Sequence, residues 1–344
     1  MSDLERQAWA GGEPEPLMSR RLMLGAGMAL GGGLLLSGCG SREQAAEPVL
    51  RVSITGKGEG DQQLLQRQAG LTTPGFQVRF ARFESGHLVI EALNAGALDY
   101  GGMSEIPPVF AAAGATQSFR QIAVLHGDVN NQVVLVPKGS SIASLADLKG
   151  KRVGYVRATT SQYFLIKMLR SVGLDWSDIT PVAMGVADGG TAFSSGALDA
   201  WAIYGFPIQR ALATQGARVL KTALGFLSGN YIVSAHVDAL ADPKKSELIG
   251  RYLQVVRQGY AWAASHEDQW TAAIAQEIGV PLAYVRDQFA RKSASYDLRP
   301  VNTAAIASQQ EVADVFAGAG LIPKAVDVRP LWDDRFNSIL ERKT

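Results

Sequence analysis

Two stretches of the chain share one tetrapeptide, LNAGALDYGGM (93–103) and SSGALDAWAIY (194–204). In each stretch, GALD stands between an apolar pattern with helical spacing and an apolar run typical of a strand. Gly96 and Gly196 are predicted to end the preceding helices in a left-handed conformation, which glycine adopts without steric cost. The Asp of each copy then leads into the strand. The repeated corner predicts that one structural unit is built twice.

The segments around both corners alternate between strand and helix patterns. Short apolar or alternating runs predict strands, and apolar residues at every third or fourth position predict helices. Such alternation predicts parallel sheets with helices on both faces, which is an α/β fold. The predicted strands are 49–55, 76–83, 97–103, 151–156, 179–185 and 197–204.

The order of these units predicts two α/β lobes. The first lobe is expected over residues 49–135 and 232–344, where the tail is mostly amphipathic helix, and the second over 136–231. A chain that leaves one lobe, builds another and returns must cross between them twice. We therefore expect a two-segment hinge with a ligand cleft between the lobes.

Length and charge narrow the class of partner. The chain has 344 residues, 47% of them hydrophobic, which suffices for two cores of ordinary size. Its formal net charge is +1, and no run of Lys and Arg is longer than two. Phosphate binding needs a basic face, so nucleic acid is not expected as a partner.

The first 38 residues are predicted to be an export signal. Arg20 and Arg21 precede an apolar stretch over 22–36 that is shorter than the roughly 20 residues of a membrane-spanning helix. The sequence at 36–39 resembles a bacterial lipobox, which implies cleavage before Cys39 and lipidation of its thiol. Residues 39–48 then form a linker. The paired arginines leave both the twin-arginine and the general secretory route open, and either Met1 or Met18 starts the chain.

Cys39 is the only cysteine, so no disulfide within the chain is expected. The domains must hold together by core packing alone. The signal and the lipid place the protein on the exported side, in the periplasm or at the cell surface, anchored to the membrane.

Four segments in order resemble the substrate-binding proteins of ABC importers for aliphatic sulfonates, taurine and nitrate. The resemblance covers about residues 49–240 and implies a type II periplasmic-binding-protein fold, whose lobes close on a small ligand and dock on a membrane permease and ATPase complex. The segments are ARFESGHLVIEALNAGALDYGGMSEIPPVFAAAGA (81–115), VLVPKGSSIASLADLKGKRVGY (134–155), ATTSQYFLIKMLRSVGLDWSDITPV (158–182) and ADGGTAFSSGALDAWAIYGFP (187–207).

Candidate ligand contacts lie where helices begin after strands. In open α/β sheets, ligands bind at the carboxyl ends of the strands, and the N–H groups of a helix start attract an anion by about 0.3 to 1 kcal/mol. The same Ser, Thr and Asp side chains are also ordinary helix caps, and Glu105 fits either a ligand contact or a group that helps to close the cleft. The candidates are Ser85, Gly86, His87, Glu105, Thr160, Ser161, Gln162 and Asp188.

Aromatic residues are expected to form an apolar wall. Trp201 and Tyr204 lie toward the carboxyl end of the second GALD strand. The chain departs from the family where sulfonate binders often carry His, which here is Gln162, and where Trp-Asp-Pro is common, which here is the segment 204–207. The expected ligand is an organic sulfonate or a related small oxyanion. Nitrate, bicarbonate and a neutral pyrimidine of the thiamine-precursor type remain alternatives.

An enzyme is not expected. The chain has no GxSxG, HExxH or Walker motif, and its four histidines lack metal-ligand spacing, so neither a metal nor a cofactor is predicted. The predicted function is a monomeric, lipid-anchored solute-binding component of an ABC importer. A sensor lobe that works without a transporter would have the same cleft and remains an alternative.

Overall fold

The computed structural model describes residues 47–114 and 117–341. Cys39, the predicted signal sequence and most of the predicted linker lie outside the described residues. Cleavage, lipidation and the export route therefore stay predictions.

The first sheet has six strands in the order β11-β4-β10-β3-β1-β2. β1 pairs in parallel with β2 and β3, whereas β10 is antiparallel to β3 and β4. These strands are β1 (Val49–Thr55), β2 (Gln77–Phe83), β3 (Tyr100–Ser104), β4 (Phe119–His126), β10 (Asn230–His236) and β11 (Asp297–Arg299).

The second sheet has five strands in the order β7-β6-β8-β5-β9. It repeats the plan of the first: β6 pairs in parallel with β7 and β8, and β5 is antiparallel to β8 and β9. These strands are β5 (Gln132–Val136), β6 (Arg152–Tyr155), β7 (Thr180–Ala183), β8 (Ala200–Tyr204) and β9 (Arg218–Thr222).

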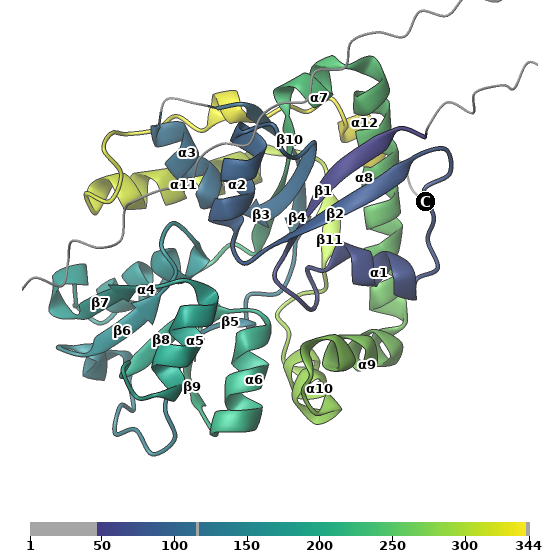
Figure 1. The fold of residues 1–344 in the computed structure, drawn as a ribbon. Helices are drawn as coiled ribbons and strands as arrows, with labels where there is room; N and C mark the ends of the chain where they lie inside the picture. The colour runs from purple at the N-terminus through teal and green to yellow at the C-terminus, as the bar shows by residue number, and fades with distance from the viewer. Residues whose placement is uncertain (1–46, 115–116, 342–344) are drawn as a thin grey trace, which may run out of the picture. The chain divides into compact units, whose positions relative to one another are not determined.

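Helices cover both faces of each sheet (Figure 1). Two buried hydrophobic clusters pack on the faces of the first sheet and two on those of the second, so each sheet is the centre of one lobe. The helices are α1 (Gln62–Gln68), α2 (Gly86–Asn94), α3 (Pro107–Ala113), α4 (Thr160–Arg170), α5 (Val186–Ser194), α6 (Phe206–Gln215), α7 (Val237–Ala241), α8 (Pro243–Ser265), α9 (Glu267–Ile278), α10 (Leu282–Ala290), α11 (Thr303–Gly318) and α12 (Asn337–Glu341), with short 3-10 turns at Leu145–Leu148, Trp176–Asp178 and Arg329–Leu331.

The predicted α/β fold is confirmed, but the sheets are mixed rather than parallel. In each sheet an antiparallel strand, β5 or β10, directly follows a crossing from the other lobe, and in the first sheet β11 is also antiparallel to its neighbour β4. The sheet pairing also differs from the predicted lobe limits by a few residues. β5 begins at Gln132 and belongs to the second sheet, and β10 begins at Asn230 and belongs to the first.

The two GALD corners have the same structure. Gly96 and Gly196 have φ angles of +68° and +77°, so the predicted left-handed helix ends are confirmed. Leu98 and Leu198, the apolar residues of the two corners, are both buried. The same local chemistry therefore ends a helix and begins a strand in both lobes.

In each lobe an arginine binds the Asp of the corner; it is Arg51 on β1 in the first lobe and Arg152 on β6 in the second. Arg51 donates to Asp99 from its backbone N–H (2.9 Å), from Nε (3.0 Å) and from a guanidinium NH₂ (2.7 Å). Arg152 makes the same three contacts with Asp199, at 2.8, 3.2 and 2.9 Å. Each fork joins the beginnings of two parallel strands. The carboxyl ends of those two strands therefore lie next to each other at the other end of the strand pair.

The chain crosses between the lobes at residues 127–131 and 223–229. The two crossings contact one another, because the backbone N–H of Gly127 donates to the carbonyl of Gly229 at 2.9 Å. A Cβ atom at Gly229 would lie 2.8 Å from the carbonyl oxygen of Gly127, and a Cβ atom at Gly127 would lie 2.2 Å from the ring of Tyr296. Gly229 is therefore needed for the crossings to approach this closely, and Gly127 for the Tyr296 ring to pack against the first crossing.

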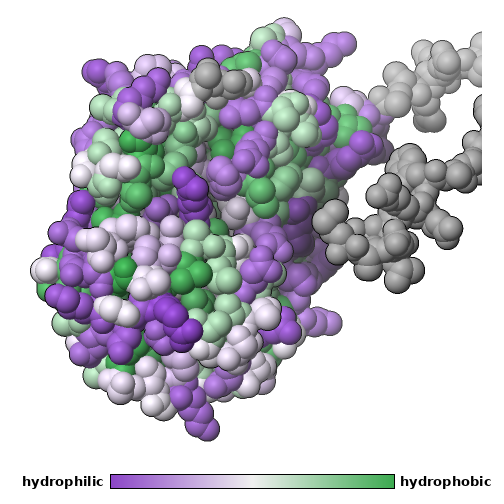
Figure 2. Space-filling model, turned by 60° about the vertical axis from the view of Figure 1, so that its left-hand side comes forward, coloured by the Kyte–Doolittle hydropathy of each residue, from purple (hydrophilic) through white to green (hydrophobic). Residues whose placement is uncertain are grey.

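The side of the molecule drawn in Figure 2 has no large apolar face. Hydrophobic and hydrophilic residues are interspersed on the side drawn in Figure 2. Over residues 47–114 and 117–341, no helix combines the length and apolarity needed to cross a membrane. The large hydrophobic side chains that are exposed are Leu88, Val172 and Leu224.

Replacing Asp99 with Asn should destabilise the fold in a pH-dependent way. Burial raises the pKa of Asp99, but hydrogen bonds from Arg51 and Lys245 outweigh it and lower the pKa to about 2. A carboxylate whose pKa falls on folding stabilises the folded state above its unfolded pKa, near 4, and loses that contribution as the pH falls toward 2. We expect D99N to lower the free energy of unfolding by about 2 kcal/mol at pH 7, measured by urea denaturation.

D199N is the matched control for this variant. The Asp199 side chain is 32% exposed against 1% for Asp99, so solvent screens its ion pair and the loss should be smaller. An equal loss in the two variants, or a loss in D99N that persists unchanged near pH 2, would contradict the role given to the buried fork.

Replacing Gly229 with Ala should weaken the contact between the two crossings. Gly229 has a φ of +82°, and the added Cβ would meet the Gly127 carbonyl at 2.8 Å. Gly225, in the same crossing, has a φ of +84° with nothing within 4 Å of its Cβ position. Both variants carry the cost of the left-handed backbone, about 1 kcal/mol. Urea denaturation should show that G229A loses more than G225A, and equal losses would mean that the close approach is unimportant.

Candidate functional site

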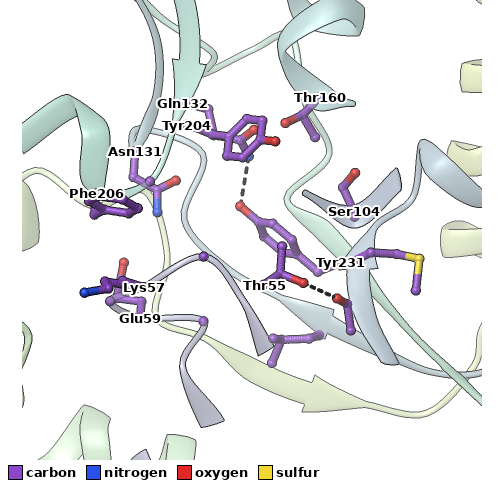
Figure 3. Close-up of a pocket in the computed structure, with 18 of the residues that line it drawn as sticks. Thr55, Lys57, Glu59, Ser104, Asn131, Gln132, Thr160, Tyr204, Phe206 and Tyr231 are labelled. Atoms are coloured by element: carbon purple, nitrogen blue, oxygen red, sulfur yellow. Dashed lines mark hydrogen bonds between the residues drawn. The ribbon is translucent and has the colours of Figure 1, made fainter. Parts of the chain in front are cut away.

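A pocket of about 170 Å³ lies at the carboxyl ends of the strands, with lining residues from both lobes (Figure 3). This is far more than the roughly 10 to 15 Å³ that a cavity needs to hold one water, so the pocket has room for a small organic molecule. The first lobe contributes the ends of β1 and β3 and the start of α2. The second contributes the starts of α4 and α6 and the end of β8.

On the side of the first lobe, small and polar residues line the pocket. Thr55, the last residue of β1, donates through Oγ1 to the carbonyl of Gly102 at 2.8 Å. The hydroxyl of Ser104 makes no hydrogen bond to another described residue. Gly86 begins α2 where a Cβ atom would lie 2.7 Å from the Cβ of Met103, so only glycine lets the helix start this close to β3.

On the side of the second lobe, α4 begins at the pocket. Thr160 lines the pocket, and its hydroxyl has no partner within the described ranges. The residue before the helix, Thr159, makes no side-chain cap bond to the first turn, and its hydroxyl donates to the carbonyl of Val156. α2 likewise has no side-chain cap. The first-turn N–H groups of both helices are thus left for another acceptor.

Two consecutive amides lie where the chain enters β5. Gln132 donates from Nε2 to the hydroxyl of Tyr231 at 2.8 Å, and Tyr231 donates in turn to the carbonyl of Asp128 at 3.0 Å. The side-chain oxygens of Asn131 and Gln132 are buried and have no hydrogen-bond partner in the described part of the chain. Figure 3 shows both side chains at the pocket.

The Gly-rich turn after β1 forms another wall. Its residues Lys57 and Glu59 line the pocket, and Lys57 is the single cation among the described residues that do so. Gln288 donates from Nε2 to the Glu59 carboxylate at 3.1 Å. Burial raises the pKa of Glu59 to about 8, with a further increase from the negative charges of Asp128 and Glu267.

Aromatic side chains complete the enclosure. The Tyr260 and Tyr296 rings stack with centroids 5.6 Å apart, and the Tyr231 ring lies 5.5 Å from that of Tyr296. Tyr204 and Phe206 enter from the second lobe. The buried hydroxyls of Tyr204 and Tyr260 have no protein partner among the described residues, so both can donate to a ligand.

Three of the predicted contacts, Gly86, Thr160 and Tyr204, line this pocket together. Trp201 lies in a neighbouring hollow of about 590 Å³, where Lys57 and Arg210 are also found. Ligand contact by these residues stays a prediction.

The other predicted contacts do not line the pocket, and several have structural partners. Ser161 accepts from the N–H of Val156 at 2.9 Å, and Gln162 accepts from that of Ala158 at 2.8 Å, so both hold the turn before α4. Ser85 is the buried N-cap residue of α2 and makes no cap bond. His87 and Asp188 lie nearby on helix surfaces, His87 beside Glu91 at 3.1 Å and Asp188 in the first turn of α5.

Glu105 lies beside the hinge rather than in the pocket. Its carboxylate accepts from the hydroxyl of Ser228 (2.6 Å), in the return crossing, and from that of Ser308 (2.9 Å), on α11. Burial raises its pKa to about 7. Of its two predicted roles, this position favours a part in closing the cleft.

Sequence reasoning missed much of the lining. The turn GKGEG follows the carboxyl end of β1, so the rule that pointed to the helix starts also applies to Lys57 and Glu59. No comparable signal marks Asn131 and Gln132, because they precede a strand rather than follow one. The missed residues include Thr55, Tyr260, Gln288 and Tyr296.

No group of three or more His, Cys, Asp and Glu side chains with the geometry of a metal site is found in the described ranges.

Two lobes, a double crossing and a pocket lined from both sides define the class of two-lobed α/β ligand-binding proteins. Solved structures with this fold include periplasmic binding proteins.

The chain matches the NMT1/THI5-like family over residues 72–270. It is 33% identical over 262 residues to an Escherichia coli (strain K12) protein provisionally designated an aliphatic sulfonates-binding protein, covering 75% of this chain and 80% of that one. The chain belongs to the NMT1/THI5-like family.

Two solved structures share the fold. The alkanesulfonate-binding protein SsuA from Xanthomonas axonopodis pv. citri, bound to MOPS, is 27% identical with a TM-score of 0.76, covering 84% of this chain and 99% of that one. The periplasmic aliphatic sulphonate binding protein SsuA from Escherichia coli is 30% identical with a TM-score of 0.70 and the same coverage. The predicted family and the predicted periplasmic-binding-protein fold are confirmed.

Replacing Glu59 with Gln should flatten the pH dependence of stability. A carboxyl group whose pKa rises on folding to about 8 keeps its proton in the folded state while the unfolded chain releases it near pH 4.5. Stability therefore falls as the pH rises between these values. The amide introduced by E59Q cannot ionise and still offers an oxygen to Gln288.

Urea denaturation at pH 5 and pH 8.5 measures this difference. The wild type should lose more stability over the interval than E59Q. The same comparison for E105Q gives the contribution of the second buried carboxyl group, whose pKa is also raised. Parallel profiles for wild type and E59Q would show that Glu59 is already ionised at pH 5.

Proposed function

We propose that this protein is the solute-binding component of an ABC importer and that it captures an organic sulfonate in the pocket between its lobes. One observation carries the proposal: α2 from the first lobe and α4 from the second both begin at the pocket without a side-chain cap. Uncapped helix starts offer N–H donors and a partial positive charge to an anion.

The polar lining suits a sulfonate. The hydroxyls of Ser104, Thr160 and Tyr204 are neutral donors, and a sulfonate has three acceptor oxygens. The described lining residues include one lysine, Lys57, and no arginine, so helix dipoles, hydroxyls and a single ammonium are available to the anion rather than a guanidinium. The aromatic rings supply an apolar surface for the organic part of the ligand. The sulfonate-binding relatives support the same ligand class.

Capture explains the two-lobed arrangement. A ligand with contacts on both lobes favours the closed state and so raises the fraction of closed protein. The permease recognises the closed protein. The proposed partners are a membrane permease with its ATPase. We further propose that the protein acts without catalysis, on the exported side of the membrane, anchored through a lipid at Cys39.

A thermal-shift screen tests the ligand class. Sulfonates should raise the melting temperature of the protein, because a ligand that binds only the folded state stabilises it by mass action. Nitrate, bicarbonate, sulfate esters and neutral pyrimidines are the comparison set. If only neutral compounds raise the melting temperature, the proposed anionic ligand is wrong. If only nitrate or bicarbonate raises it, the ligand is that anion and not an organic sulfonate.

T160V links the screen to the pocket. The valine keeps the shape of Thr160 and removes one donor to a charged group, so calorimetry should show sulfonate binding weakened by about tenfold or more. T214V is the matched control, because the Thr214 hydroxyl donates to the Arg210 carbonyl on the exposed side of α6. Unchanged binding in T160V would place the anion elsewhere.

A further inference from the structure

Two side-chain oxygens in the pocket have no donor. They are Oδ1 of Asn131 and Oε1 of Gln132, and neither has a hydrogen-bond partner in the described part of the chain. The two residues are only 8% and 2% exposed, so both amides are more than nine-tenths buried. Both line the pocket, and Figure 3 shows them beside Tyr204 and Phe206.

The orientation of the Gln132 amide follows from its neighbours. The single hydroxyl proton of Tyr231 is donated to the carbonyl of Asp128. The Tyr231 oxygen can therefore only accept from Gln132, at 2.8 Å, and the Gln132 atom that faces it must be the amide nitrogen. If the amide oxygen faced Tyr231 instead, neither atom would have a proton to donate. The carbonyl oxygen Oε1 is consequently the free end of the amide.

A buried acceptor without a hydrogen-bond donor costs free energy. This cost is removed only when a bound ligand donates a hydrogen bond to the acceptor. An alkyl chain that displaced water from the pocket would leave both oxygens dry and unpaired. A sulfonate oxygen cannot serve them either, because it is itself only an acceptor. The group that contacts the two amides must be separate from the anionic group.

We propose that the pocket selects sulfonates that carry a second polar group with an N–H or O–H donor, and that Gln132 and Asn131 accept from this group. The inference rests on the proposed function and narrows its ligand class. It predicts discrimination against plain alkanesulfonates, since a site with buried polar groups rejects an analogue that cannot pair with them.

Both a hydroxyl and an ammonium group provide such a donor. The pocket is lined by the carboxyl groups of Glu59 and Glu84 as well as by the cation Lys57, so the lining does not exclude a positive charge at the second group. The same hydrogen bonds form in either case, and the two chemistries are separated by experiment.

The test compares ligands of matched size. Calorimetry on the wild-type protein should use 2-hydroxyethanesulfonate, 2-aminoethanesulfonate and 1-propanesulfonate, in which a methyl group takes the place of the donor. At least one donor-bearing ligand should bind about tenfold more tightly than 1-propanesulfonate. The ligand with the greater preference identifies the donor as hydroxyl or ammonium.

Two variants assign the preference to the amides. Q132M and N131A each remove one acceptor, and each should reduce the preference several-fold while 1-propanesulfonate still binds. The ratio of the two affinities within one variant is the readout, so an effect on the hinge or on stability cancels. N130A is the matched control, because the Asn130 side chain donates to the Arg291 carbonyl at 2.6 Å and does not line the pocket.

The outcomes separate this inference from the proposed function. If the wild type binds 1-propanesulfonate as tightly as both other ligands, the inference is wrong and the sulfonate function stands. If both variants keep the full preference, the donor contacts other groups and the inference is also wrong. If no sulfonate binds, the proposed function fails and the inference fails with it.

Discussion

The arrangement of both lobes depends on the fork between an arginine and the Asp of a GALD corner. Arg51 with Asp99 joins β1 to the start of β3, and Arg152 with Asp199 joins β6 to the start of β8. Because β1 and β3 are parallel, as are β6 and β8, fixing one end aligns the other. Thr55 and Ser104 therefore reach the pocket from the first lobe and Tyr204 from the second. Asp99 is more buried than Asp199. Its carboxylate also accepts from the ammonium of Lys245, which connects the long α8 to the same corner.

The second constraint is the double crossing. In each lobe an antiparallel strand, β5 or β10, directly follows one of the crossings, so each crossing ends in the middle of a sheet. The glycines 127 and 229 let the crossings touch, and the hydroxyl of Ser228 binds Glu105 within the same region. Asn131 is the last residue of the first crossing, and Gln132 is the first residue of β5. In the proposed function, ligand contact by these amides and closure of the lobes would therefore involve the same segment of chain.

Sequence reasoning found the parts of the site that obey a local rule and missed those that do not. Gly86 and Thr160 could be predicted because they begin helices after strands. Ser161 and Gln162 satisfy the same rule, yet their side chains accept backbone N–H groups of the turn, which no pattern of residue types distinguishes from ligand contact. The polar lining of the crossing and the tyrosines of the tail could not be predicted, because their place in the pocket follows from contacts across a hundred residues or so, such as that between Tyr231 and Gln132.

The sequence by itself determined the α/β fold, the two lobes and the two repeated corners. These features depend on apolar periodicity and on glycine conformation, which act over a few residues. Only the tertiary structure decided that the sheets are mixed, that Glu105 faces the hinge and that two amide oxygens in the pocket lack donors. Sheet order, burial and hydrogen-bond partners are set by residues far apart in the chain, so their chemistry appears only when the lobes are folded.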